Sequence, residues 1–448
     1  MDTTDVFKAY DVRGTYPDQI DERLTRAVGS AFATFAKSPS IVIARDMRPS
    51  GVALCAAFAE GARAVGVTVI DLGLASTDFL YFAAGHLDLP GAMFTASHNP
   101  AQYNGIKLCL AGAKPIGAES GLAEIEAMTN SFYAEPASGA LAPRESRDLL
   151  DEWVEHVHSF VDVAALRHLN IVADTANGMG GFVAPRVFKG LPFDVDIIFE
   201  ELDGTFPNHP ADPLNPANLV DLQRRVLETG ADVGLAFDGD ADRVFLIDEK
   251  AQPISGSTTT AMVAAVMLGR SPGSTILYNL ICSKTVREVI AEHGGVGVRT
   301  RVGHSYIKQV MAETGALFGG EHSGHYYFRD NFRADSGIIT ALVVLELMST
   351  SHAPLSEIVR PFNRYGDSGE INTKVASPVE SVERIATHLG ETGVAVDRLD
   401  GLTADYGSWW FNLRPSNTEP LLRLNVEAAN DEECEARVRE VVAMIEGT

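Results

Sequence analysis

The stretch Thr95-Ala96-Ser97-His98-Asn99-Pro100 follows an apolar run from Leu89 to Phe94 and ends in Asn-Pro. An apolar run followed by turn residues is typical of a strand that leads into a loop. The Ser97 hydroxyl can face a ligand there, but serine is a weak nucleophile and needs a base, a metal or local positive charge. Turn residues such as Ser and Asn also often make only local hydrogen bonds, so the stretch alone leaves both interpretations open.

Outward from this turn, apolar strand-like runs alternate with helical patterns, which predicts α/β layers with parallel strands. Residues 134–149 are less periodic and mix Pro, Ser, Gly and charges, which favours a linker or an unstable helix start. The runs 169–173, 233–237, 244–247 and 275–279 are predicted strands, and 21–35, 52–64, 258–268, 336–349 and 431–446 are predicted helices.

The 448 residues exceed what one core can organise. The pattern indicates three related α/β domains with mixed sheets and a smaller C-terminal α+β domain. We expect the four domains to span residues 1–148, 149–252, 253–364 and 365–448.

The formal charge of −24 argues against a nucleic-acid or anionic-membrane binder, because both surfaces would repel the protein. The four cysteines are scattered without a C-x-x-C pair, which fits a reducing compartment. The first residues lack an apolar signal core and no apolar run reaches membrane-spanning length. We therefore expect a cytoplasmic protein that acts on small molecules, as a monomer or homodimer.

A second chemical signal is the loop Asp238-Gly239-Asp240-Ala241-Asp242-Arg243 between two apolar strands. Three neighbouring carboxylates repel one another, and a hard cation relieves that repulsion by taking oxygen ligands. Mg²⁺ is the preferred ion where a phosphate supplies a further oxygen. An EF-hand would have Gly where Arg243 stands and helices on both sides, and a haloacid-dehalogenase-type loop would have Thr or Val at Asp242.

Two further loops carry polar groups suited to sugar phosphates. Arg414-Pro415-Ser416-Asn417-Thr418 offers a guanidinium fork, hydroxyls and an amide to a phosphate, although a surface turn has the same composition. In Gly320-Glu321-His322-Ser323-Gly324-His325, Glu and Ser suit sugar hydroxyls and His can move protons. A metal site is a rival interpretation of these histidines, but no third ligand has a fitting spacing.

Together the motifs YDVRG, TASHNP, NGIK, DGDADR, GHS, GEHSGH and RPSNTEP resemble those of the α-D-phosphohexomutase superfamily, most closely its bacterial phosphomannomutase/phosphoglucomutase branch. The likeness covers nearly the whole chain in the same order. It implies four domains around a central cleft, namely a phosphoserine domain, a metal domain, a sugar-recognition domain and a phosphate-binding domain.

The resemblance implies a phosphoserine at Ser97 and Mg²⁺ held by Ser97, Asp238, Asp240 and Asp242. It further implies reversible transfer of phosphate between the 6- and 1-positions of mannose or glucose phosphates, through a hexose 1,6-bisphosphate. By motif position, the implied catalytic residues around the phosphoryl group are Arg13, Lys107, His325 and Arg243, with Lys107 and His325 moving protons. The implied substrate-binding residues are Lys284, His304, Glu321, Ser323, Arg414, Ser416, Asn417 and Thr418.

Phosphoglucosamine mutase is the alternative, but its members more often carry GEQSG and DGDGDR loops, and this chain has GEHSG and DGDADR. His322 stands where many members of the family have Met and is expected to alter packing near the sugar. Outside this class, one alternative is a phosphosugar-binding protein or phosphatase without the mutase cycle, against which the intact Ser97, three aspartates and Arg243 count. The other is a Ca²⁺-binding structural module, which the failed EF-hand pattern opposes. Neither requires a phosphate on Ser97.

Overall fold

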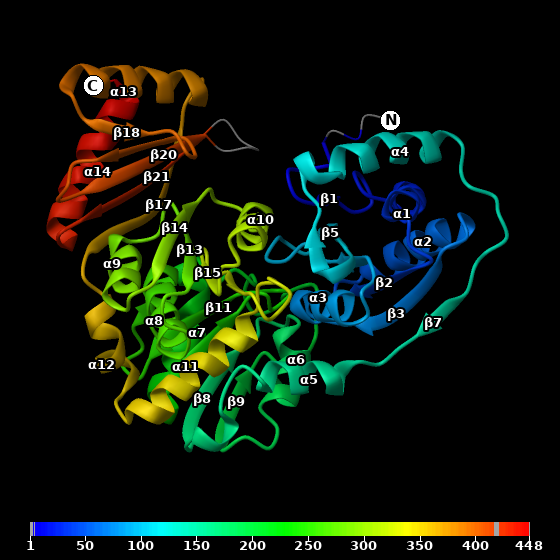
Figure 1. Ribbon diagram of the computed structural model, residues 1–448, viewed down its shortest axis with the longest axis horizontal. Coiled ribbons are helices and arrows are strands. Elements are labelled where there is room, and N and C mark those ends of the chain that lie inside the picture. Colours follow the sequence, from blue (N-terminus) through cyan, green and yellow to red (C-terminus); the bar gives the residue numbers. More distant parts are fainter. Residues whose placement is uncertain (1–2, 4, 416–420, 448) are drawn as a thin grey trace.

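The computed structural model describes residues 3, 5–415 and 421–447, and of Glu119 and His304 only the backbone. Its strands form four sheets, each with its own helices, in the order of the chain (Figure 1). We call these the first to fourth units. In Figure 1 the fourth unit stands over the third, away from the first.

The first unit has a mixed sheet in the order β1-β5-β4-β2-β3-β7, with β6 paired to β5. Strands β4, β2, β3 and β7 run parallel, whereas β5 is antiparallel to both β4 and β1. Its strands are β1 (Val12–Thr15), β2 (Ser40–Arg45), β3 (Thr68–Leu74), β4 (Gly91–Phe94), β5 (Tyr103–Leu110), β6 (Lys114–Pro115) and β7 (Arg144–Ser146). Its helices are α1 (Glu22–Ala36), α2 (Gly51–Ala64), α3 (Thr77–His86) and α4 (Leu122–Ala134).

The second unit has the sheet order β12-β11-β10-β8-β9, in which β10, β8 and β9 are parallel and β11 and β12 are antiparallel. Every residue of β10 and β11 is buried, as the apolar runs Val233–Phe237 and Val244–Ile247 predict. Its strands are β8 (Leu169–Asp174), β9 (Phe193–Ile198), β10 (Val233–Phe237), β11 (Val244–Asp248) and β12 (Pro253–Ile254). Its helices are α5 (Leu150–His158), α6 (Gly180–Val187) and α7 (Val220–Thr229).

The third unit has the sheet order β14-β13-β15-β16, again with parallel strands and one antiparallel edge strand. Its strands are β13 (Thr275–Asn279), β14 (Val296–Thr300), β15 (Phe318–Gly320) and β16 (Tyr326–Phe328). Its helices are α8 (Gly256–Arg270), α9 (Lys284–Glu292), α10 (His304–Thr314), α11 (Gly337–Ser351) and α12 (Leu355–Val359).

The fourth unit differs, because its sheet β17-β21-β20-β19-β18 is antiparallel throughout. Its strands are β17 (Gly366–Lys374), β18 (Ala395–Asp397), β19 (Leu402–Asp405), β20 (Trp410–Pro415) and β21 (Leu421–Ala428). Helices α13 (Pro378–Thr392) and α14 (Asp431–Glu446) cover it. The predicted fold class, three mixed α/β sheets and a smaller α+β unit, is confirmed.

The first three units share a hydrophobic core, whereas the fourth has a separate one. Phe79 of α3 packs on Trp153 of α5 with ring centroids 5.3 Å apart, which ties the first unit to the second. Continuous burial of this kind fixes the relative positions of packed elements. The loops that leave the first three sheets are therefore held in a defined arrangement.

The predicted strands and helices agree with the observed elements to within two residues at most ends. The stretch 134–149 is the main difference, because it contains β7, which extends the first sheet parallel to β3. All three residues of β7 are exposed, so the sequence carries no apolar strand pattern there.

Within the described residues no single helix is long and apolar enough to cross a membrane. One pair of helices, Gly337–Ser351 with Leu355–Phe362, meets that criterion only when the two are taken together, and it is bent by 98°.

Candidate active site

Ser97 lies in the turn after β4, with a left-handed backbone (φ 50°). Its side chain is buried, and its hydroxyl donates a hydrogen bond of 2.8 Å to Oδ2 of Asp238. Nδ1 of His98 lies 3.2 Å from the same hydroxyl. A serine held in this way is directed at the acidic loop of the second unit.

The acidic loop is the connection between β10 and β11, and it brings Asp238, Asp240 and Asp242 together. These three carboxylates are buried, and one oxygen of each lies within 4.8 Å of the others. The loop approaches Ser97 closely, because a Cβ on Gly239 would lie 2.3 Å from the Ser97 carbonyl oxygen. Glycine is therefore required at 239 for the two loops to meet.

Two cations from different units lie against these carboxylates. Lys107 of β5 places Nζ 2.9 Å from Oδ2 of Asp240 and 2.7 Å from Oδ2 of Asp242. Nε of Arg243 donates to Oδ2 of Asp238 at 2.9 Å, and its NH2 group lies 2.6 Å from Nδ1 of His98. The cluster thus balances three buried acids with two buried bases.

The titration of these groups follows from burial and pairing. Burial disfavours the charged form of Asp240, but Lys107, the hydrogen bond from Thr77 and the charge of Arg243 together outweigh that effect and lower the pKa of Asp240. Burial likewise opposes the charge on Lys107, yet Asp240 and Asp242 raise its pKa well above the ordinary value. Burial and the positive charge of Arg243 lower the pKa of His98, so that its imidazole is neutral. Because its pKa is raised in this way, Lys107 is a stable cation at neutral pH.

The cluster fits a hard divalent cation. Oδ1 of Asp240 and Oδ1 of Asp242 are buried and have no hydrogen-bond partner among the described residues. Carboxylate oxygens of this kind, with the Ser97 hydroxyl beside them, are the donor type that Mg²⁺ prefers. Bound there, the ion would offset negative charge on a phosphate carried by Ser97.

The predicted sugar loop lies beside this cluster, between β15 and β16. The Glu321 carboxylate accepts hydrogen bonds from Tyr327 Oη (2.7 Å) and Asn279 Nδ2 (3.1 Å). Nδ1 of His325 lies 3.0 Å from Ser323 Oγ, and its Nε2 lies 3.9 Å from Oδ1 of Asp242. The structure therefore brings the sugar loop and the aspartate loop together.

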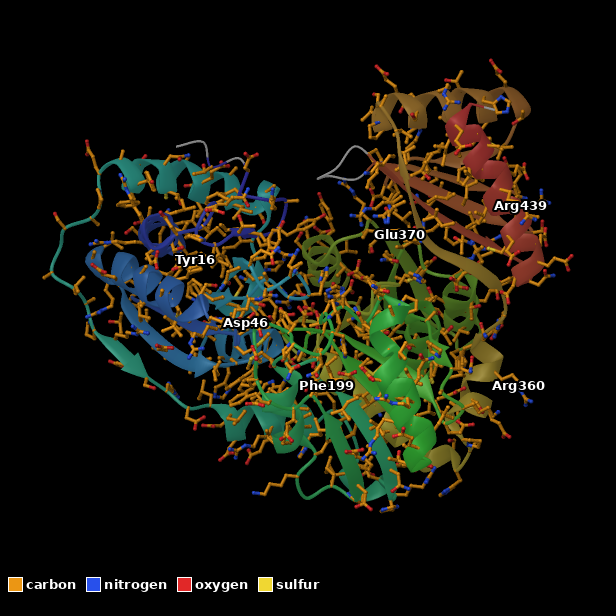
Figure 2. The ribbon with its side chains drawn as sticks, turned by 180° about the vertical axis from the view of Figure 1, so that it is seen from behind. Tyr16, Asp46, Phe199, Arg360, Glu370 and Arg439 are labelled. Carbon is orange, nitrogen blue, oxygen red and sulfur yellow. The ribbon has the colours of Figure 1, made fainter. Side chains whose placement is uncertain are left out.

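Two predicted arginines lie in the first and fourth units. Arg13 of β1 donates to Oδ1 of Asn99 at 2.7 Å, which places it at the Ser97 turn. Arg414 of β20 is buried and pairs with Glu370 at 3.4 Å. Figure 2 marks Glu370 at the edge of the fourth unit nearest the third.

Lys284 begins α9 at the junction of the third and fourth units. Its Nζ lies 2.6 Å from the carbonyl oxygen of Gly407 and 3.3 Å from Oδ1 of Asp405. These contacts connect two units and are not shared with the Ser97 cluster. His304 begins α10, and its side chain is outside the description, as are Ser416, Asn417 and Thr418 entirely.

Sequence reasoning missed three polar residues beside the cluster. Thr77 Oγ1 donates to Oδ2 of Asp240, and Arg48 and Asp46 form a buried ion pair behind the Ser97 turn. Charged residues in the polar loop 45–51 were a usable signal, because charges directly after a buried strand often face a site.

Three units whose loops direct a serine, three aspartates and the predicted sugar loop at one place define a multidomain enzyme that moves phosphoryl groups. Four models of the phosphoglucomutase/phosphomannomutase family match the chain: alpha/beta/alpha domains I, II and III at residues 4–134, 151–252 and 255–365, and the C-terminal domain at 370–444. The chain therefore belongs to the phosphoglucomutase/phosphomannomutase family.

Individual relatives agree with this membership. A phosphomannomutase of Escherichia coli strain K12 is 38% identical over 448 residues, 98% of each chain. A protein of Xanthomonas campestris pv. campestris named phosphohexose mutases is 39% identical, covering 99% of this chain and all of the relative. The crystal structure of a phosphoglucomutase/phosphomannomutase family protein from Burkholderia thailandensis has a TM-score of 0.89 at 30% identity, over 100% of this chain and 98% of that one. The chain is a phosphohexose mutase and hence an isomerase, as the sequence motifs predicted.

Proposed function

We propose that this mutase interconverts the 6- and 1-phosphates of mannose, and also of glucose, through a phosphoserine at Ser97. The observation that carries the proposal is the 2.8 Å hydrogen bond between the Ser97 hydroxyl and Asp238, at a cluster suited to Mg²⁺. The named relatives support mannose as a substrate, since the Escherichia coli protein is a phosphomannomutase.

In the proposed first half-reaction, a sugar hydroxyl oxygen attacks the phosphorus on Ser97. A new P–O bond to the sugar forms as the bond to Ser97 Oγ breaks, and the product is a hexose 1,6-bisphosphate. The bisphosphate turns over in the site, and the second half-reaction returns its other phosphate to Ser97. Transfer of this kind depends on positioning and charge stabilisation.

The hydroxyl proton needs an acceptor, and His325 suits that role better than Lys107. Lys107 is held as a cation by Asp240 and Asp242, so it suits charge stabilisation or proton donation. His325, at the end of the sugar loop, contacts both Ser323 and Asp242. Arg243 and Arg13 would add positive charge around the transferring group.

The remaining groups would hold the substrate and the metal. Mg²⁺ would be bound by Ser97, Asp238, Asp240 and Asp242, with hexose 1,6-bisphosphate as activator. Glu321 and Ser323 would hold sugar hydroxyls, the non-reacting phosphate would bind at Arg414, Ser416, Asn417 and Thr418, and His304 would be a further ligand contact. The contacts of Lys284 favour a role between units over a ligand contact. The four matched ranges support domains spanning 1–148, 149–252, 253–364 and 365–448.

A coupled assay with mannose 1-phosphate, glucose 1-phosphate and glucosamine 1-phosphate tests the proposal, with Mg²⁺, a trace of hexose 1,6-bisphosphate and Ser97→Ala alongside. We expect turnover of the first two and a loss of several orders of magnitude in the variant. Intact mass should show one phosphate on the wild-type chain and none on Ser97→Ala. Preference for the glucosamine ester, or full activity of the variant, would refute the proposal.

A further inference from the structure

We propose that Arg48 is the positioning residue that holds the Ser97 turn in its reactive geometry, an inference that rests on the proposed role of Ser97. Arg48 follows β2 and is completely buried. Fully buried arginines are rare and need partners for their donors. Here the partners are backbone carbonyls of the turn itself.

The guanidinium donates four hydrogen bonds to this turn. Nη2 donates to the carbonyl oxygens of Ser97 (2.8 Å) and Asn99 (2.6 Å). Nη1 donates to those of Pro100 (2.8 Å) and Tyr103 (2.9 Å). One planar group thus binds four carbonyl oxygens of the turn, from Ser97 to Tyr103, the first residue of β5.

The backbone of Ser97 is held through both its amide and its carbonyl. The amide donates to Thr95 Oγ1 at 2.9 Å, and the carbonyl oxygen accepts from Arg48. Asp46 is the ion-pair partner of Arg48, with Oδ2 3.3 Å from Nε, and its Oδ1 accepts from the backbone N–H of Arg48 at 2.9 Å. The Asp46–Arg48 pair therefore holds the carbonyl side of a residue whose positive φ is unfavourable for serine.

The second unit closes over Arg48 from the other side. The Phe206 ring lies 5.1 Å from the guanidinium carbon, and a Cβ on Gly204 would lie 2.6 Å from Arg48 Cα. Figure 2 marks Asp46, the partner of Arg48, on the side of the first unit that faces the second. Arg48 therefore contacts both the Ser97 turn and the second unit, and so helps to fix the position of Ser97 relative to Asp238.

A lysine could not perform this role. Its ammonium is a single point with three donors, whereas the four carbonyls need the two-pronged guanidinium. Arg48→Lys keeps a positive charge near Asp46 but loses most of the hydrogen bonds to the carbonyl oxygens of the turn. A small displacement of a nucleophile costs about 100-fold in rate when positioning carries catalysis.

The experiment compares wild type, Arg48→Lys and Val183→Ala, a core change in α6 that lowers stability away from the site. Each is assayed below its unfolding temperature for kcat and KM, and by hydrogen exchange of the peptide covering 95–103. For Arg48→Lys we expect kcat to fall about 100-fold with KM within about threefold, and faster exchange confined to that peptide. For Val183→Ala we expect kcat near wild type.

The outcomes separate this inference from the proposed function. A wild type without mutase activity refutes the proposed function, while the exchange measurement still tests the positioning. An active wild type with an Arg48→Lys variant of unchanged kcat and unchanged exchange in 95–103 overturns the role of Arg48. An equal loss of kcat in Val183→Ala also overturns it, because reduced stability alone would then explain the effect.

Discussion

The hydroxyl of Ser97 and the Asp238 carboxylate lie 2.8 Å apart, although they belong to different units and are separated by 141 positions in the chain. The same carboxylate oxygen accepts a hydrogen bond from Nε of Arg243. Asp238 therefore links the predicted nucleophile to a fixed positive charge. This contact joins the first and second units at the point where the reaction is proposed to occur.

Replacing Asp238 by Asn tests whether the negative charge of this side chain, and not only its size, is needed for activity and for Mg²⁺ binding. The amide has nearly the same size but no negative charge, so we expect kcat to fall about 100-fold and the Mg²⁺ concentration for half-maximal rate to rise at least about tenfold. Steady-state assays over a Mg²⁺ titration measure both. Asp232→Asn, at the opposite end of β10, is the matched control and should leave both values unchanged. Unaltered Mg²⁺ dependence in Asp238→Asn would contradict the metal assignment.

Lys107→Met should reveal how the carboxylates depend on their cation. Removing Lys107 leaves Asp240 and Asp242 buried without their close partner, which costs about 3–5 kcal/mol in the free energy of unfolding. Because a bound cation can replace part of that charge, Mg²⁺ should raise the unfolding temperature of the variant more than that of wild type.

Thermal unfolding with and without Mg²⁺ checks this expectation. Lys114→Met, an exposed change on β6 of the same sheet, should match wild type in stability and in its response to Mg²⁺. If Lys107→Met unfolds at the wild-type temperature, the lysine does not neutralise the acidic cluster.

The strands β10 and β11 of the second unit could be predicted because their side chains form apolar runs. Val233–Phe237 and Val244–Ile247 are apolar throughout, and the acidic residues between them stand out against that background. The meeting of Ser97, the aspartates and the sugar loop was predictable only through the resemblance to a family, because residues far apart in the chain supply it. Local patterns do not report which loops meet.

Arg48 and β7 escaped prediction because no side-chain pattern marks either of them. Arg48 binds four main-chain carbonyls, a group that every residue carries, so no side-chain pattern points to its role. Strand β7 is exposed and short, and only its pairing with β3 makes it a strand. For Lys284 the motif position predicts a ligand contact, and the observed contacts with Asp405 and Gly407 of the fourth unit indicate a second role between units.

Lys284→Met distinguishes a contact with the substrate phosphate from a contact between the third and fourth units. A lysine that binds the substrate phosphate would raise KM by tenfold or more when lost, because charge-assisted hydrogen bonds contribute about 1.5–3 kcal/mol. The observed partners predict less than about a threefold change in KM, and a stability loss of about 1 kcal/mol or less, since Asp405 is partly exposed. Steady-state kinetics with mannose 1-phosphate decide between them, with exposed Lys250→Met as control.

The buried carboxyl of Asp78, at the start of α3, gives a pH-dependent prediction. Burial raises its pKa from 3.8 to about 7, although hydrogen bonds from Ser76 and Ser336 oppose the rise. Ser336 Oγ donates to Oδ2 of Asp78 at 2.7 Å and also caps α11 of the third unit. Asp78 thus joins the first and third units through a carboxyl that binds its proton tightly in the folded state.

The stabilisation from this bound proton is complete below the unfolded pKa and is lost as the pH rises through about 7, because only the folded chain holds the proton in between. Asp78→Asn is neutral at every pH, so it should remove that loss. Between about pH 5.5 and about pH 8.5, the unfolding free energy of the variant should gain about 2 kcal/mol relative to wild type. Denaturant unfolding at both pH values measures the difference, with exposed Asp18→Asn expected to parallel wild type. Parallel curves for Asp78→Asn and wild type would mean that Asp78 is already ionised in the folded protein, and that the acidic cluster nearby tolerates a fourth buried negative charge.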